Sequence, residues 1–273
     1  MKATNLRQPW VAGQFYPSSL KQLNSQISGY IDKNAKKENC IACMLPHAGY
    51  DYSGLVAAQT VSRINLKEKI ILLGPNHTGK GVPFSLMPQG AWLTPLGEVK
   101  IDSRLAKELL KEAPQLEADT GAHLNEHSLE VELPFLQYFK RDFQIVPIAF
   151  ASQSLDTLKA IGKSIASCAQ RLKIMDSLLL VASSDMTHYE PQEQAEKKDN
   201  LAIEAILKLD TDKLFTVINE HNITMCGVAP VIAMLSAAKA LGAKKGELIK
   251  YQTSGDTTGD TSAVVGYAGI ITS

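Results

Sequence analysis

Apolar positions follow two spacings along this chain. Short continuous apolar runs are typical of strands buried on both faces, and apolar positions three and four residues apart predict amphipathic helices. The runs predict strands at Ile41–Leu45, Lys69–Leu73, Phe84–Met87, Val99–Ile101, Gln144–Ala149, Ser177–Val181, Glu247–Gln252 and Ala263–Ile271. The wider spacing predicts helices at Leu20–Ile31, Ser53–Arg63, Ser103–Glu112, Glu126–Tyr138, Leu155–Leu172, Pro191–Leu207, Thr211–Ile218 and Val228–Leu241.

Three residues refine the predicted helix boundaries. Ser53 is suited to capping the start of its helix, because a serine hydroxyl accepts from free backbone N–H groups. Pro191 fits the first helical position, where its missing N–H costs nothing. Pro134 lies inside the Glu126–Tyr138 pattern, so we expect it to kink or shorten that helix.

The order of elements predicts one α/β domain over residues 1–273. The series strand, helix, strand from Ile41 to Leu73 has the size of a βαβ unit, whose two strands are parallel. The Gly- and Thr-rich stretch Thr253–Gly266 connects two apolar runs and is a loop rather than a domain linker. We therefore expect a central sheet, mostly parallel or mixed, flanked by helices.

Composition narrows the class of protein. A hydrophobic content of 45% supports a sizeable core, and 28 basic against 28 acidic residues predict no basic surface for nucleic acid. No apolar run reaches the roughly 18–20 residues of a membrane span, so no membrane partner is expected. The first residues lack a signal peptide's apolar stretch, which favours a cytoplasmic protein. Cysteines in such a chain are more often buried, catalytic or metal-bound than disulfide-paired.

Two histidines follow consecutive predicted strands. His47 comes after Ile41–Leu45 in the motif PHAGY, and His77 comes after Lys69–Leu73 in GPNHTG. Ligands of open α/β sheets bind beyond the carboxyl ends of the strands, and consecutive strands often lie side by side. A lone histidine there more often serves a turn or a hydrogen bond. For the matched pair, each with flanking proline and glycine, a shared metal site and a structural role are about equally good interpretations.

Three further residues are candidates for the same site. Asp185 and His188 follow the strand Ser177–Val181 in SSDMTHY, although loop capping is an alternative for both. Cys226 in MCGVAP precedes the helix Val228–Leu241, and a helix N-terminus favours the thiolate that binds metals. Alone, Cys226 would be typical of a buried apolar thiol. Two histidines and a cysteine leave coordination positions open, as a catalytic metal site requires.

Two other motifs carry less chemistry. Cys40 and Cys43 imitate a redox or zinc motif, but in a strand their side chains would point to opposite faces, so we reject them as a site. The segment GAHLNEHSLEVELP predicts an amphipathic helix with leucines inward and glutamates, including Glu132, outward. His127 and Glu130 are three residues apart and would share a helix face, which makes them candidates for acid/base or orienting roles.

Six motifs together carry a family resemblance: GQFYP, LPHAGYDYSG, LLGPNHTG, EHSLEVELPFL, SSDMTHY and MCGVAP. In this order and spacing the chain resembles the Memo family, also called protein B of the AmmeMemoRadiSam system. The fold of that family is similar to the class III extradiol ring-cleaving dioxygenases, which form a single α/β domain and bind non-haem iron through two histidines and a glutamate.

The resemblance implies roles for particular residues. It implies that His47, His77 and Cys226 are the metal ligands, and that His188 is the acid/base group, with Asp185 and His127 completing the pocket. It also implies an aromatic wall, against which a substrate or a phosphotyrosine-like peptide would lie, made of Phe15, Tyr50 and Tyr52. A pathway association with a radical SAM protein and an AMMECR1-like protein is implied in the same way.

Cys226 stands where the dioxygenases use a carboxylate. A thiolate is softer, which shifts the metal preference toward copper(I), zinc or thiolate-ligated iron, so ring cleavage does not transfer directly. The leading hypothesis is a metal-dependent oxidoreductase that holds iron, with copper or zinc as alternatives. Two rivals stay open: a zinc hydrolase with His188 as base, and a non-catalytic module that binds a small molecule or peptide in the same pocket.

Overall fold

The buried apolar runs form the central strands that their pattern predicts. In the computed structural model, which describes residues 6–273, the strands are β1 (Leu6–Arg7), β2 (Ala42–Leu45), β3 (Lys69–Pro75), β4 (Phe84–Leu86), β5 (Ala91–Thr94), β6 (Gly97–Ile101), β7 (Glu117–Ala118), β8 (Gln144–Phe150), β9 (Leu178–Ser183), β10 (His188–Glu190), β11 (Gly246–Thr253) and β12 (Val264–Thr272). Strands β1, β5, β7 and β10 were not predicted; each has four residues or fewer, too short for a clear pattern.

The helices lie between these strands. They are α1 (Leu20–Tyr30), α2 (Tyr50–Ser62), α3 (Ser103–Glu112), α4 (Glu132–Phe139), α5 (Leu155–Arg171), α6 (Gln192–Leu207), α7 (Thr211–Glu220), α8 (Val228–Ala240) and α9 (Gly255–Thr258), with single 3₁₀ turns η1 (Gly121–His123) and η2 (Met175–Ser177). No helix within the described residues has the length and apolar character that a membrane span needs.

The sheet is mixed, with a parallel centre. Strands β6, β8, β3, β9 and β2 are neighbours in this order, and each pairs in parallel with the next. Antiparallel strands extend both sides: β5 pairs with β6, and the long β12 pairs with β2 and with β11. The carboxyl ends of the five parallel strands therefore open at one edge, where ligands of α/β sheets bind.

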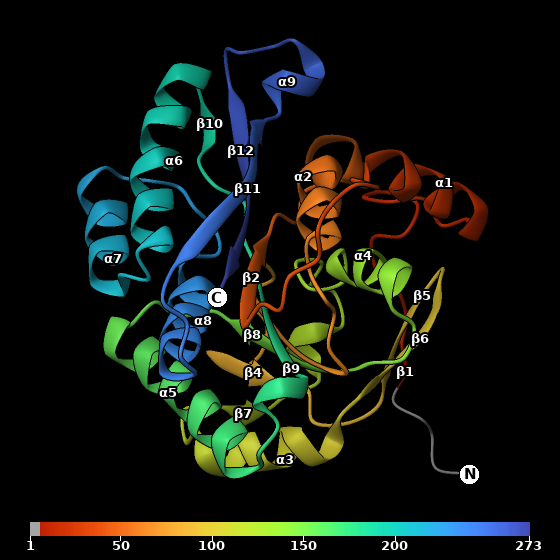
Figure 1. Cartoon of the computed structure of the whole chain (residues 1–273), viewed down its shortest axis with the longest axis vertical. Coiled ribbons are helices and arrows are strands. Elements are labelled where there is room, and N and C mark those ends of the chain that lie inside the picture. The colour runs from red at the N-terminus through yellow and green to blue at the C-terminus, as the bar shows by residue number, and fades with distance from the viewer. Residues whose placement is uncertain (1–5) are drawn as a thin grey trace.

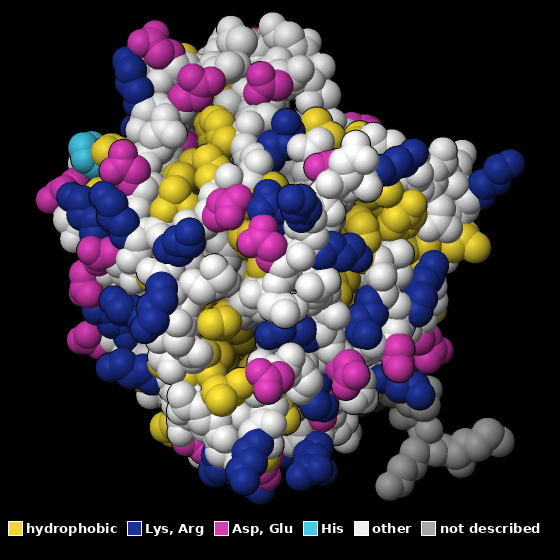
Figure 2. All heavy atoms as spheres, in the orientation of Figure 1, with side chains coloured by type: hydrophobic (Ala, Val, Ile, Leu, Met, Phe, Trp, Pro, Cys, Tyr) yellow, Lys and Arg dark blue, Asp and Glu magenta, His cyan; other side chains and the backbone are white. Residues whose placement is uncertain are grey.

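Helices cover both faces of the sheet, because its central strands are apolar on both sides. Along β3, Ile71 and Leu73 pack into the core beneath α3, α5, α6, α7 and α8, whereas Ile70 and Leu72 pack into the core beneath α1, α2 and α4. Figure 1 shows these two groups of helices on opposite sides of the sheet, with the β11–β12 hairpin and α9 at its end. This single α/β domain confirms the predicted fold class. The face drawn in Figure 2 mixes basic and acidic side chains, as the balanced charge predicts.

Three predicted helix boundaries differ from the structure. Helix α2 begins at Tyr50, so Ser53 is no cap; its hydroxyl lies inside the helix and donates to the carbonyl of Ala48. Pro191 is the cap residue of α6 rather than its first helical residue. Helix α4 begins only at Glu132, which places Pro134 in its first turn and confirms that proline shortens the pattern.

Candidate metal centre

The carboxyl edge of the sheet holds one cavity that gathers the predicted chemical residues. It has a volume of about 640 Å³ and is lined by His47, His77, His127, Asp185, His188 and Cys226, together with aromatic side chains. His47 follows β2, His77 follows β3, Asp185 and His188 follow β9, and Cys226 precedes α8. The parallel strands thus bring together residues that are far apart in the chain.

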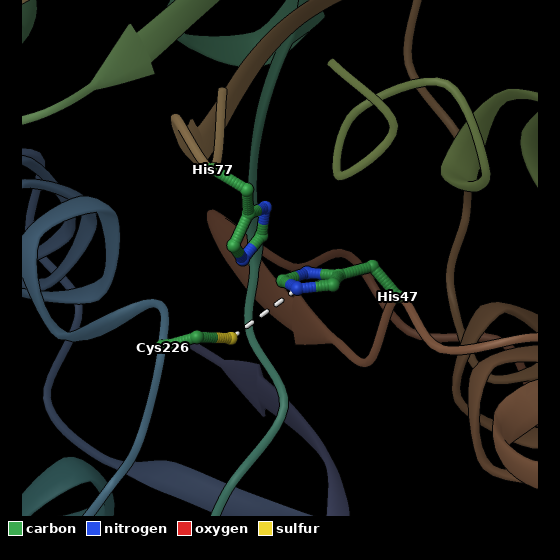
Figure 3. Close-up of side chains that lie close together, drawn as sticks. All are labelled: His47, His77 and Cys226. Atoms are coloured by element: carbon green, nitrogen blue, oxygen red, sulfur yellow. Dashed lines mark hydrogen bonds between the residues drawn. The ribbon is translucent and has the colours of Figure 1, made fainter. Parts of the chain in front are cut away.

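His47, His77 and Cys226 form a group that could hold a metal ion. One ligand atom from each lies within 4.8 Å of the other two. The Nε2 of His47 is 3.2 Å from the Sγ of Cys226, and the two imidazole rings are 5.2 Å apart between centroids. Figure 3 shows both rings and the sulfur pointing toward one another from three different elements. Two imidazoles and one thiolate are a known ligand set for transition metals.

His47 is held from both sides. Its Nδ1 lies 2.6 Å from Ser183 Oγ at the end of β9, and its backbone N–H donates to Asp185 Oδ1 at 2.8 Å. The ring is 2% exposed, and its Nε2 faces the cavity. Burial lowers the pKa of His47 well below its usual value, and the nearby His77 lowers it further. His47 is therefore neutral, which is the form that binds a metal.

Glu126 holds His77. Its Oε1 lies 3.0 Å from His77 Nδ1, and its Oε2 accepts the backbone N–H of the same residue. The backbone N–H groups of His127 and Ser128 also donate to Oε1, each at 2.9 Å. Burial alone would raise the pKa of Glu126. The hydrogen bond from His77, the charge of His77 and the backbone hydrogen bond from Ser128 instead lower this pKa to about 2. The carboxylate is thus ionised and fixes His77 so that its Nε2 is free.

A second group of ligand atoms, from His77, Glu126 and His127, also lies within 4.8 Å. A carboxylate offers roughly four lone-pair positions. Glu126 already accepts from the Nδ1 and backbone N–H of His77 and from two further backbone N–H groups. Three of these hydrogen bonds go to Oε1 and one to Oε2, so Glu126 acts mainly to orient His77 and to hold the turn at His127.

Glu126→Gln should lower the affinity for a divalent metal about 10- to 100-fold, the range typical of groups that orient a ligand histidine. An amide cannot accept all four hydrogen bonds, so the His77 ring would lose its fixed orientation. The measurement is competition for Zn²⁺ with a chromophoric chelator. Glu98→Gln, an exposed glutamate of β6, is the matched control. Equal affinities for the two variants would remove Glu126 from the site.

Cys226 lies in a tight turn before α8. Its Sγ accepts the backbone N–H of Asp185 at 3.3 Å. A Cβ on the next residue, Gly227, would be 2.4 Å from the carbonyl oxygen of Ser183, so only glycine lets this turn approach β9. Burial raises the pKa of the Cys226 thiol, and the charge of Asp185 raises it further. The expected stabilisation of the thiolate by the helix is therefore outweighed, and a bound cation would be needed to favour the thiolate.

His188 and Asp185 lie beside the three candidate ligands. The Nδ1 of His188 is 2.9 Å from the carbonyl oxygen of Thr224, and its backbone N–H donates to Thr224 Oγ1 at 2.7 Å. Because a carbonyl only accepts, Nδ1 carries a proton, which leaves Nε2 as the ring nitrogen available for proton transfer in this cavity-lining residue. Asp185 is buried, and burial raises its pKa to about 6 although the His47 N–H opposes this shift.

The structure changes the predicted aromatic wall. Phe15 and Tyr52 line the cavity, but Tyr50 does not. The Tyr50 ring is buried against Phe135, 4.2 Å away between centroids, and its hydroxyl donates to the carbonyl of Val131. Tyr50 is the first residue of α2, so its side chain turns into the core. Tyr189 and Tyr267 line the cavity instead.

The segment before α4 is not the predicted amphipathic helix. His127 does reach the cavity, where its ring stacks on His77 at 4.7 Å. Glu130 does not share its face: it pairs with Arg7 at 2.7 Å in the core. Glu132 is fully buried, so its expected outward position is wrong. Cys40 and Cys43 are free, buried and absent from the cavity lining, in agreement with their rejection as a site.

Three residues that position the site were missed by the sequence patterns: Glu126, Ser183 and Thr224. Each acts on a histidine 36 to 136 residues away in the chain. The predicted amphipathic helix placed Glu126 in solvent, and Ser183 and Thr224 are small polar residues without a distinctive spacing. Of these three residues, only Glu126 lies in a motif that offered a signal, EHSLEVELPFL.

The family model and the similar proteins all point to one family. The model of the family described as "Memo-like protein" matches residues 7–271. A MEMO1 family protein of Methanopyrus kandleri is 43% identical, with 97% of this chain and 98% of the relative covered. MEMO1 family proteins of Aquifex aeolicus and Methanocaldococcus jannaschii are 46% and 45% identical, each over 97% of this chain and 98% of the relative. The match spans the motifs that hold the candidate metal ligands, and the chain belongs to the Memo family.

Proposed function

We propose that this protein is a metal-dependent oxidoreductase that holds iron, or copper, through His47, His77 and Cys226. The observation that carries the proposal is the arrangement of these three donors. Their ligand atoms converge within 4.8 Å, while the second ring nitrogen of each histidine is held by Ser183 or Glu126. Ligand histidines of metal sites are commonly fixed in this way.

The donor set also fits the proposed metals. A thiolate with two imidazoles suits iron, copper or zinc and disfavours magnesium and calcium, which prefer oxygen ligands. Three protein ligands facing an open cavity leave coordination positions for a substrate or oxygen. When bound, iron or copper would supply one-electron chemistry at this position.

The surrounding residues would bind the substrate and move a proton. A cavity of about 640 Å³ lies within the range of small-molecule sites, roughly 300–1,000 Å³. Phe15, Tyr52, Tyr189 and Tyr267 give it an aromatic lining, which suits a planar or apolar group. The free Nε2 of His188 would accept a proton from a substrate held there, and Thr224 keeps the ring in that orientation.

The decisive experiment is element analysis of protein made without added metal, followed by oxygen uptake after Fe(II) loading with a panel of catechols. One equivalent of iron or copper with oxygen uptake supports the proposal. One equivalent of zinc without oxygen uptake contradicts it and favours a zinc hydrolase with His188 as base. Metal without any turnover would favour the binding module.

His188→Gln should keep the metal and lose turnover roughly 10²- to 10⁴-fold, the usual contribution of one acid/base group. Glutamine retains a similar size but cannot take up a proton at neutral pH. The measurement pairs metal stoichiometry with oxygen uptake. His221→Gln changes an exposed histidine after α7 and is the control. Turnover retained in His188→Gln would exclude His188 from the mechanism.

A further inference from the structure

Three buried glutamates close together in the chain have different surroundings. Glu126 accepts four N–H hydrogen bonds beside His77. Glu130 accepts from Arg7 Nη1, from two backbone N–H groups and from the Tyr16 hydroxyl, at 2.6–3.0 Å. Glu132 is 0% exposed, and its Oε1 contacts Ser183 Oγ at 2.9 Å. Its Oε2 has no hydrogen-bond partner among the described residues.

The three partners of Ser183 Oγ indicate which atoms donate. Ser183 Oγ lies 2.7 Å from the carbonyl oxygen of Ser128, 2.6 Å from His47 Nδ1 and 2.9 Å from Glu132 Oε1. A serine hydroxyl has one proton and two lone pairs. The Ser128 carbonyl can only accept, and at 2.7 Å against 2.9 Å it is closer to Oγ than Glu132 Oε1 is, so we assign the serine proton to it. The other two partners must then donate to Oγ: His47 through Nδ1–H, and Glu132 through a carboxyl O–H.

The environment of Glu132 agrees with a neutral acid. Within residues 6–273 no lysine, arginine or histidine forms an ion pair with it, and the charge that acts on it most comes from Asp185, of the same sign. An ionised carboxylate buried without a cation destabilises the fold, or the group takes up a proton instead. Burial accordingly raises the pKa of Glu132 well above its usual value, and the charge of Asp185 raises it further.

We propose that Glu132 is a neutral carboxylic acid that positions His47 through Ser183. By donating to Ser183 Oγ, the Glu132 carboxyl directs the serine proton to Ser128 and leaves Oγ as the acceptor for His47 Nδ1–H. The lone pair of His47 Nε2 then faces Cys226, 3.2 Å away. The hydrogen-bond chain itself needs no metal; its use in holding one rests on the proposed function.

Two variants at position 132 test this chain. Glu132→Gln keeps an N–H donor for Ser183, so affinity for Zn²⁺ should stay within about 3-fold of the wild type. Glu132→Met has a similar length but no donor, and its affinity should fall about 10- to 100-fold. Equal losses of affinity in both variants would overturn the proposal. That result is expected if Glu132 is ionised, because neither glutamine nor methionine carries the negative charge of a carboxylate.

Two measurements on metal-free protein separate this proposal from the proposed function. Infrared difference spectra between wild type and Glu132→Gln should contain the carbonyl stretch of a protonated carboxyl, and a carboxylate band in its place would overturn the proposal. Nitrogen-15 NMR of wild-type histidines should find His47 protonated at Nδ1, and protonation at Nε2 would overturn it too. If both results are as expected but wild-type protein binds no metal, the metal function fails and the Glu132 chain stands.

Discussion

Cys226→Ala is expected to lower metal affinity by more than about 100-fold, beyond the loss typical of a group that only orients a ligand. Alanine removes the single sulfur of the donor set, and two histidines alone leave the ion weakly held. The fold should persist, because Cys226 is only partly buried in a turn whose backbone is held by Ser184 and Gly227. Metal per chain by element analysis, with far-ultraviolet circular dichroism, measures both expectations.

The control for this variant is Cys40→Ala. Cys40 is a free cysteine at the opposite end of β2 from His47, so the variant removes one thiol without touching the cavity. Its metal content should equal that of the wild type. A Cys226→Ala protein that retained full metal would show that the ion binds elsewhere, and a loss in both variants would indicate damage to the fold.

Glu130→Gln should destabilise the protein by about 3–5 kcal/mol, the usual result of removing one partner of a buried ion pair. Arg7 is 2% exposed, and its Nη1 lies 2.7 Å from Glu130 Oε2. The guanidinium Cζ of Arg7 lies 4.2 Å from the centroid of the Trp92 ring. The variant would leave this buried guanidinium without a counter-charge. At roughly 2–4 °C per kcal/mol for a chain of this size, Tm should fall by roughly 6–20 °C.

Thermal and urea unfolding measure the loss of stability. Two further variants serve as a control and as a rescue. Glu193→Gln breaks an exposed pair with Lys197 and should leave Tm unchanged. Arg7→Met combined with Glu130→Gln should recover part of the stability, because no unpaired charge then remains. A Tm for Glu130→Gln equal to that of Glu193→Gln would contradict the buried pair as a source of stability.

The same ion pair connects the N-terminal segment to the metal centre. Arg7 also donates through Nε to the carbonyl of His123 and through Nη2 to the carbonyl of Glu126. It therefore holds the backbone of the residue whose carboxylate orients His77. This connection agrees with the absence of a regular helix between η1 and α4: several polar groups of that segment bond to distant elements.

The predicted helix over this segment shows where local pattern stops being sufficient. The spacing of Leu129, Leu133 and Leu136 is helical, and all three leucines are buried as predicted. A helix from Glu126 would nevertheless have placed the glutamates in solvent. In the structure, Glu126 is bonded to His77, 49 residues away, and Glu130 to Arg7, 123 residues away. These contacts outweigh helical propensity, which is a small contribution per residue.

The sequence pattern predicted the central strands and most helices, and the short motifs with the family resemblance pointed to the three candidate ligands. Buried apolar runs and strand-end motifs are local signals, and parallel strands place their carboxyl ends at one edge. Tertiary contacts alone show how the site histidines are held: Glu126 contacts His77, Ser183 contacts His47, and Thr224 contacts His188. It also turned Tyr50 into the core and brought Tyr189 and Tyr267 to the cavity. These contacts join residues far apart in the chain through buried hydrogen bonds and packing. Such contacts leave no regular spacing in the sequence, so a sequence pattern does not predict them.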